Sequence, residues 1–223
     1  MKTSSALLLA LLVTPVLGCG GAQPPAQSVQ HADASLLVPT SELGPPFVVQ
    51  QRLKGQYGTR DTTLDCVVQL ADDKLTVVGL TPFGTRAFVV EQSGTDVRFE
   101  KLIDREVPFD PTDVLADIHR VFFRGLPTPG DAPLSDGTHE GVDRAELVRE
   151  TWKGGTLVER RFQGLEGPRP SLVVVTFEGA KAPVIAPRVR LTHVTYGYTL
   201  DIENLEQKTL ESGYTLEVER TPG

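Results

Sequence analysis

Histidines and carboxylates are the residues of this chain whose types could serve metal binding or acid-base catalysis. The four histidines are His31, His119, His139 and His193, and no two of them stand at the i, i+2 or i, i+4 spacing typical of metal ligands. The segment HEGVD at His139 lacks the second histidine of a zinc protease motif. We therefore expect neither a metal site nor another cofactor.

Pairs of acidic residues, which supply the acid and the base of many hydrolases, have simpler structural roles here. We expect them in a turn, on a solvated helix face and on the outer side of a strand: Asp72-Asp73, Asp113 with Asp117, and Asp201 with Glu203. The sequence also lacks G-x-S-x-G, phosphate-loop, G-x-G-x-x-G and C-x-x-C motifs. These features predict a protein that is not an enzyme, and a hydrolase using His119 or His193 is the least favoured alternative.

Three other positions have both a structural and a chemical interpretation. Cys66 shares an alternating face with Val68, which favours a buried small hydrophobic side chain over a reactive thiol. His119 lies between an isoleucine and an arginine and is expected at the surface or edge of a helix. Arg160 and Arg161 point to opposite sides of a strand, so one of them either meets an inward carboxylate or ligand head group or lies at a strand edge.

Length and charge limit the classes of partner. The chain has 223 residues and a formal net charge of −7, and it is long enough for one domain with a sizeable core. It contains no run of basic residues of the kind that binds nucleic acid or anionic lipid. We expect a monomer that binds no nucleic acid.

The first residues resemble a bacterial lipoprotein signal. Lys2 provides a positive end, residues 6–13 form an apolar run too short to span a bilayer, and Gly18 precedes Cys19. The resemblance implies cleavage after Gly18, acylation of Cys19 and anchoring in a membrane. Gly20 stands where an inner-membrane lipoprotein often has aspartate, which favours the outer membrane, facing the periplasm. The alternative is an ordinary secretory signal.

The rest of the chain divides into a tether and one domain. Residues 19–45, with the segment GGAQPPAQ, predict a flexible lipidated tether after the signal peptide of residues 1–18. In residues 46–223 apolar side chains alternate with polar ones, which predicts a mainly β domain of about eleven sequential antiparallel strands. The first five are FVVQQRLKGQY, TLDCVVQLADD, KLTVVGL, TRAFVVEQSG and TDVRFEKL, and the last is GYTLEVE.

One segment, FDPTDVLADIHRVFFRG, has the helical period instead. Asp110 can cap it, Pro111 suits its first turn, and Gly125 can end it. Its apolar stripe must pack on a sheet or inside a barrel and consists of Val114, Leu115, Ile118, Val121 and Phe122. The opposite, polar side carries Asp113, Asp117 and Arg120. After it, residues 126–141 predict a long polar loop, because they are rich in proline and glycine.

The turn in GLTPFGTRAF is unusually apolar. Leu80, Pro82 and Phe83 stand where polar residues are expected between two strands. Either Phe83 contacts lipid, or it folds back over the end of the core. Sequence composition favours neither alternative.

These elements together resemble the LolB-like outer-membrane lipoproteins over about Val48 to Leu205. The resemblance is carried by the signal, the meander strands, LTVVGLTPFGTRAFVV, the helix at DPTDVLADI and the late strand YTLDIENL. It implies an open, strongly curved antiparallel sheet or incomplete barrel, with one or a few helices on a concave face that accepts acyl chains. In LolB a leucine protrudes from a Pro-Leu-Gly loop to help deliver lipoproteins into the membrane, and Pro82-Phe83-Gly84 looks like that motif.

The expected function is therefore non-enzymatic: binding or transfer of an acylated or other apolar ligand in the periplasm. The expected partners are the membrane, through acylated Cys19, and acyl chains, lipids or other lipoproteins. Leu80, Pro82 and Phe83 would form a membrane-contact loop. An apolar groove would be lined by Val68, Phe88, Val90, Phe99, Ile118, Phe122, Trp152 and Phe162. The main alternative is an envelope assembly lipoprotein that docks a protein partner and binds no small molecule.

Overall fold

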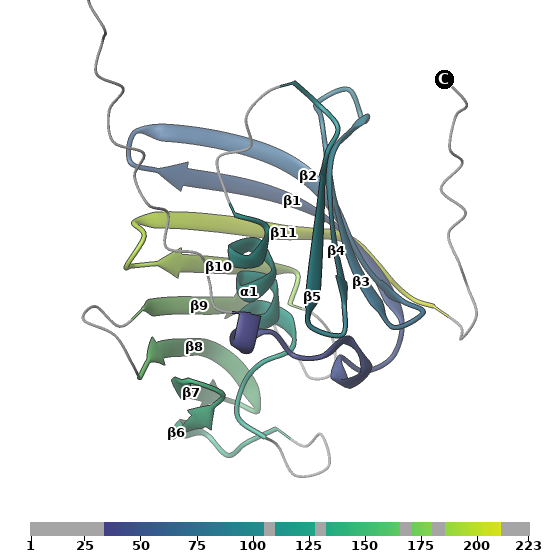
Figure 1. Cartoon of the computed structure of the whole chain (residues 1–223). Coiled ribbons are helices and arrows are strands. Elements are labelled where there is room, and N and C mark those ends of the chain that lie inside the picture. The colour runs from purple at the N-terminus through teal and green to yellow at the C-terminus, as the bar shows by residue number, and fades with distance from the viewer. Residues whose placement is uncertain (1–33, 105–109, 128–132, 166–170, 180–185, 211–223) are drawn as a thin grey trace, which may run out of the picture. The chain divides into compact units, whose positions relative to one another are not determined.

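A computed structural model describes residues 34–104, 110–127, 133–165, 171–179 and 186–210 (Figure 1). The chain divides into two compact units, residues 1–30 and 31–223, and every described residue lies in the second. The predicted signal peptide, Cys19 and the predicted strand GYTLEVE lie outside the described residues. None of the helices in the described ranges has the length and apolar character needed to span a membrane.

Eleven strands form one antiparallel sheet in the order β5-β4-β3-β2-β1-β11-β10-β9-β8-β7-β6. Their bounds are β1 Phe47–Tyr57, β2 Arg60–Ala71, β3 Lys74–Leu80, β4 Arg86–Ser93, β5 Asp96–Lys101, β6 Gly137–Asp143, β7 Glu146–Lys153, β8 Thr156–Gly164, β9 Leu172–Glu178, β10 Arg188–His193 and β11 Tyr198–Thr209. The sheet ends at β5 and β6, so it is open, as predicted. Among the described strands, β1 to β5 form one meander and β6 to β11 form another, and the pairing of β1 with β11 joins the two.

The sheet is strongly curved, and its concave side faces the one α-helix of the described residues (Figure 1). Side chains alternate between the two faces, as in β7, where every second residue is buried. Cys66 on β2 is buried as predicted, and burial raises the pKa of its thiol to about 12. The concave face therefore carries the core, and the convex face carries polar and charged residues.

Strand β6 corrects the predicted loop of residues 126–141. Its first residues, Gly137 to Gly141, fall within that loop, which the sequence predicts from its proline and glycine content. They form a strand through backbone hydrogen bonding to β7, in which Gly137 lies opposite Trp152 and Asp143 opposite Glu146. An edge strand needs less apolar surface than a central one, so composition alone does not reveal it.

Helix α1 (Pro111–Phe122) starts where the sequence predicts. The Asp110 carboxylate accepts a hydrogen bond from the backbone N–H of Thr112 at 2.8 Å, and proline occupies the first turn. Two residues of the predicted apolar stripe, Leu115 and Val121, are buried against the sheet. The helix therefore lies on the concave face through the stripe that its period specifies.

The segment before β1 is packed into the core. It contains two short 3-10 helices, η1 (Ala34–Leu36) and η2 (Thr40–Glu42), and Leu37 between them is fully buried. The backbone N–H of Val38 donates to Nδ1 of His119 at 3.1 Å, and the Gln92 amide donates to the Val38 carbonyl at 2.8 Å. This part of the predicted tether is thus fastened to helix α1 and β4.

The surface position predicted for His119 is wrong. The ring is fully buried, because Val38 and Gln92 supply partners for both of its nitrogens. Since Nδ1 accepts a hydrogen bond, Nε2 carries the proton of the neutral ring and donates to the Gln92 amide oxygen at 2.7 Å. Burial, with the charges of Arg124 and Arg144, lowers the pKa of His119 to about 3.

We predict that acidification destabilises the domain through two buried histidines. Burial and the charge of Arg120 lower the pKa of His193 to about 4, while that of His119 is about 3. An unfolded histidine titrates near 6.5, so below that pH the unfolded chain binds more protons, and the free energy of unfolding falls as pH falls. Each histidine contributes at most about 1.4 kcal/mol per pH unit.

Urea unfolding between pH 7 and pH 5, above the range of ordinary carboxyls, measures this loss. His119→Gln retains a hydrogen-bonding side chain but cannot bind the proton, so its pH dependence should be shallower. An equal slope in the variant and the parent would contradict the prediction.

Candidate functional site

The concave face holds two apolar clusters, and helix α1 bridges them. One cluster is built on β1 to β4 with Leu37 and Leu43 of the preceding segment and includes Leu115 of the helix, and the other is built on β7 to β11 and includes Val121. Ile118 packs against the first cluster and Phe122 against the second. The helix therefore covers apolar surface on both halves of the sheet.

Most of the predicted groove residues are core residues beneath or beside this helix. Val68, Phe88 and Val90 belong to the first cluster, Phe162 belongs to the second, and Trp152 is also buried. Phe99, on the edge strand β5, is 37% exposed. The structure gathers the set on one face, and contact with a ligand stays a prediction.

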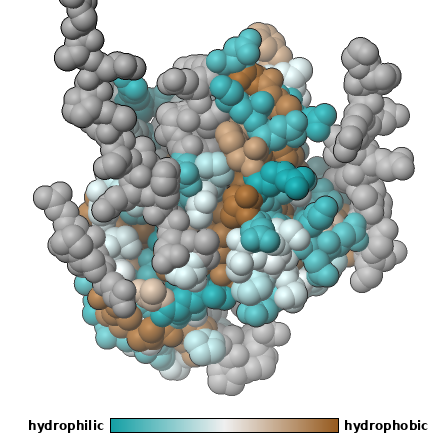
Figure 2. Space-filling view, viewed as in Figure 1, coloured by the Kyte–Doolittle hydropathy of each residue, from teal (hydrophilic) through white to brown (hydrophobic). Residues whose placement is uncertain are grey.

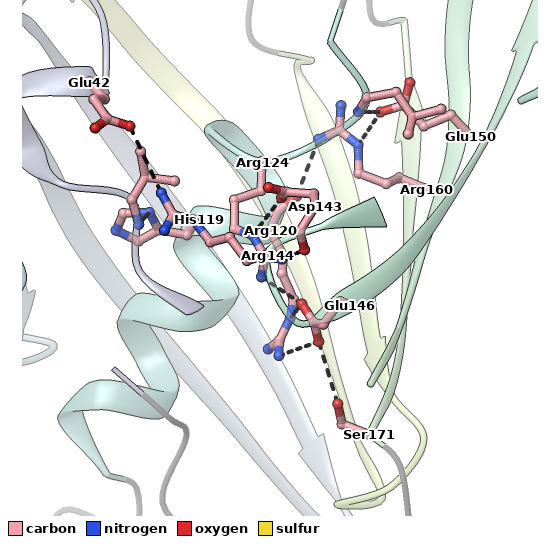
Figure 3. Close-up of polar contacts among 12 residues, drawn as sticks. Glu42, His119, Arg120, Arg124, Asp143, Arg144, Glu146, Glu150, Arg160 and Ser171 are labelled. Atoms are coloured by element: carbon pink, nitrogen blue, oxygen red, sulfur yellow. Dashed lines mark hydrogen bonds and ion pairs between the residues drawn. The ribbon is translucent and has the colours of Figure 1, made fainter. Parts of the chain in front are cut away.

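A buried cluster of charges joins α1 to the C-terminal half of the sheet (Figure 3). The Arg120 guanidinium donates to Asp117 at 2.9 Å and to Glu146 of β7 at 2.9 Å. Arg124, just after the helix, donates to the other Glu146 oxygen at 2.5 Å and to the Asp143 carboxylate at 2.8 Å. Two guanidiniums are thus enclosed by three carboxylates, and we call these five residues the charge cluster.

The predicted solvated helix face is therefore wrong for Asp117 and Arg120. Both are buried, at 6% and 3% exposure, and both point toward the sheet. Burial raises the pKa of Asp117 against the opposing effect of Arg120, and the carboxylate also accepts a hydrogen bond from the Tyr198 hydroxyl. Burial would raise the pKa of Glu146 as well, but the guanidiniums of Arg120 and Arg124 outweigh it and lower that pKa.

A second buried ion pair lies beside the charge cluster. Arg160 of β8 points inward and donates to Glu150 of β7 at 2.6 Å, so the inward alternative for this arginine is confirmed. Glu150 also accepts a hydrogen bond from the Trp152 indole at 3.0 Å.

Gly125 does not end the helix, which stops at Phe122. Instead, Gly125 lies against the ion pair, because a Cβ at this position would be 2.5 Å from the Arg160 guanidinium. Any larger residue at this position would force the Arg160 and Glu150 side chains to shift.

The loop between β3 and β4 presents Phe83 to solvent. Its side chain is 93% exposed, so the fold-back alternative is wrong; Pro82 is exposed and Leu80 is half-buried. The N–H of Thr81 donates to the Thr85 carbonyl at 2.7 Å, and the two threonine hydroxyls are 2.7 Å apart. A closed turn therefore holds an aromatic ring away from the sheet.

The histidines do not assemble a catalytic or metal centre among the residues described. The His119 ring contacts Val38 and Gln92, and the His193 ring stacks on Tyr196 with centroids 4.2 Å apart. Within the same ranges, no group of three His, Cys, Asp or Glu residues could hold a metal ion. The polar residues of the concave face instead satisfy one another and position the helix.

A family model described as "Protein of unknown function (DUF3261)" matches residues 48–206, which include β2 to β10 and most of β1 and β11. The chain belongs to this family. Among curated proteins, none matches this DUF3261 chain.

A search of solved structures found chains that are similar to this DUF3261 chain. A LolA superfamily protein from Nitrosomonas europaea superimposes with a TM-score of 0.50 and 14% identity, covering 80% of this chain and 90% of that one. A putative outer membrane lipoprotein-sorting protein domain from Vibrio parahaemolyticus has a TM-score of 0.41 and 10% identity, covering 77% and 88%. The first likeness establishes a LolA-like fold, which confirms the architecture implied by the sequence resemblance.

We predict that removing the central carboxylate of the charge cluster destabilises the domain. Glu146→Gln leaves Arg120 and Arg124 buried with too little negative charge, and breaking a buried ion pair costs about 3 to 5 kcal/mol. Asp201→Asn is the matched control, because it removes the same charge from an exposed pair with Arg190. That pair should contribute less than about 1 kcal/mol. Urea unfolding of both variants measures the difference, and equal losses would contradict a structural role for the cluster.

Proposed function

We propose that this protein is a non-enzymatic, lipid-anchored protein of the outer membrane that binds or transfers an acylated or other apolar ligand in the periplasm. The observation that carries the proposal is that helix α1 covers two apolar clusters on the concave face of an open sheet. A LolA-like fold and the lipoprotein-type signal that precedes Cys19 support it.

The ligand would bind where α1 now lies. Displacing the helix uncovers apolar side chains of both clusters, and each methylene of an acyl chain buried there gains about 0.8 kcal/mol. The helix contacts the C-terminal half partly through Asp117 and Arg120, and buried ion pairs give little net stability because their desolvation is costly. The C-terminal half of the interface is therefore the side we expect to open first.

Phe83 would bring the domain to the membrane surface. An aromatic ring that is 93% exposed on a closed turn can enter the interfacial region without unfolding anything. Together with an anchor at Cys19, this contact places the concave face close to the source or destination of an acyl chain. Leu80 and Pro82 complete the membrane-contact loop.

We predict that loosening α1 strengthens ligand binding. If a fatty acid must displace the helix, Glu146→Gln raises the population of the open state and lowers the apparent Kd severalfold. Asp201→Asn, on the convex face, should leave the Kd unchanged. Titration of the full chain with a fluorescent fatty acid measures both, alongside mass spectrometry of co-purified lipid. Absence of any bound lipid, together with one stoichiometric protein partner in crosslinked cells, would instead support the assembly function.

We predict that Phe83→Glu impairs delivery to membranes and spares stability. An exposed position tolerates a charge within about 0.5 kcal/mol, whereas a glutamate resists entry into the bilayer interface. The control is Thr95→Glu, which adds the same charge in the exposed β4–β5 turn. The readouts are transfer of a fluorescent acyl ligand to liposomes and the melting temperature. A large drop in melting temperature, or equal transfer by both variants, would refute the role of Phe83.

A further inference from the structure

Strand β5 forms one of the two open edges of the sheet. Among the residues described, no strand lies beyond it, and five of its six residues are exposed. Figure 1 shows β5 at the front of the molecule, and Figure 2 shows hydrophobic residues at the surface over β4 and β5. An open edge carries backbone groups that can pair with a strand of another chain.

The hydrogen bonding to β4 shows which backbone groups of β5 point outward. Directly after β5, the N–H of Leu102 donates to the Ala87 carbonyl of β4 at 2.9 Å. In an antiparallel pair, successive residues alternate between bonding that neighbour and pointing away from it. Counting back from Leu102, every second residue therefore directs its N–H and C=O toward the open edge. These residues are Val97, Phe99 and Lys101.

On the concave face, β5 carries an aromatic ring that is only partly covered. Val97 and Phe99 lie opposite the buried Gln92 and Val90 of β4, which places them on the concave side. The Phe99 ring lies near that of Phe88, with centroids 6.3 Å apart, yet Phe99 is 37% exposed. Phe99 is thus covered from the side of β4 and left exposed at the edge of the sheet.

On the convex face, β5 presents opposite charges two residues apart. Arg98 lies opposite Glu91 of β4, and Glu100 lies opposite Val89. Both Arg98 and Glu100 are exposed, and neither forms an ion pair with another residue in the described part of the chain. Their spacing determines the register in which a neighbouring strand would match both charges.

A second copy of β5 matches these features in one register. If the two strands pair antiparallel with Phe99 opposite Phe99, Arg98 of each copy lies opposite Glu100 of the other. The outward-directed backbone groups then bond one another, with Val97 opposite Lys101. The two neighbouring registers that keep this bonding place Arg98 opposite Arg98, or Glu100 opposite Glu100. Like charges directly opposite each other are unfavourable, so only the register centred on Phe99 is self-complementary.

We infer that two copies of this chain pair through β5 in a symmetric dimer, with Phe99 beside its two-fold axis. The symmetry makes every contact occur twice, as in other dimers that use the same surface on both subunits. The axis runs perpendicular to the paired strands, so the concave faces of both copies lie on the same side and the Phe99 rings meet between them. This assembly goes beyond the proposed function and differs from the monomer expected from the sequence, in which strand order and open edges are not visible.

Disulfide cross-linking of the full chain in intact cells tests the pairing. Phe99→Cys places two thiols opposite each other in the dimer, where Cα atoms of a hydrogen-bonded pair lie about 5.5 Å apart, within reach of a disulfide. Val142→Cys is the matched control, because Val142 is an exposed hydrophobic residue on β6, the other open edge. After mild oxidation, Phe99→Cys should yield disulfide-linked dimer. Val142→Cys and the parent, whose Cys66 is buried, should not.

Charge reversal in the Phe99→Cys chain tests the register. Arg98→Glu or Glu100→Arg alone places two pairs of like charges across the interface and should lower cross-linking about fivefold. The double variant restores opposite charges and should restore cross-linking. Melting temperatures separate lost pairing from lost folding. If Arg98→Glu is unstable because it faces Glu91, Glu100→Arg still decides, since Glu100 faces Val89.

The inference fails if Phe99→Cys cross-links no better than Val142→Cys, if the single reversals leave cross-linking unchanged, or if the double variant does not recover it. A mixed disulfide between Phe99→Cys and a different protein would also overturn self-pairing, and it would identify β5 as a docking edge for another chain. Fatty acid binding and the effect of Phe83→Glu do not depend on these results, so the proposed function is tested separately.

Discussion

Every charge that helix α1 buries on the concave face meets an opposite charge, and the rest of the structure depends on this pairing. Arg120 joins a carboxylate of its own helix to Glu146 on β7, so one side chain fixes both the position and the rotation of the helix. Without such partners, two guanidiniums in a low-dielectric interior would exclude the helix from the sheet. No buried side-chain nitrogen or oxygen lacks a hydrogen-bond partner in the described part of the chain.

The two halves of the sheet hold the helix by different means. On the N-terminal half, apolar packing around Leu115 combines with the neutral His119 hydrogen bonds, and the segment containing Leu37 closes over them. On the C-terminal half, the charge cluster supplies direction but little net free energy. Both halves therefore hold the helix through apolar packing, and the C-terminal half adds buried charges whose desolvation is costly.

The sequence predicted the sheet and helix well because their signals are local. Alternation located ten of the eleven strands, and Asp110 with Pro111 located the helix start. Edge strand β6 was missed, since its order comes from pairing with β7. The sequence also did not reveal that Asp117, His119 and Arg120 are buried. A polar side chain on a helix can be buried only when another segment, distant in sequence, supplies its hydrogen-bond or ion-pair partner. A signal was present nonetheless: Glu146 and Glu150 alternate in register with Val148 on the inward face of β7.

The pairing of β1 with β11 has a consequence for how the chain folds. The N-terminal meander can form from neighbouring hairpins, but its β1 edge gains a partner only from the last described strand, with Leu53 opposite Ile202. Contacts so distant in sequence carry a large loop-closure entropy and slow folding. A chain that emerges from its amino terminus first would therefore leave the β1 edge unpaired until β11 had emerged, and that open edge is prone to aggregation in the meantime.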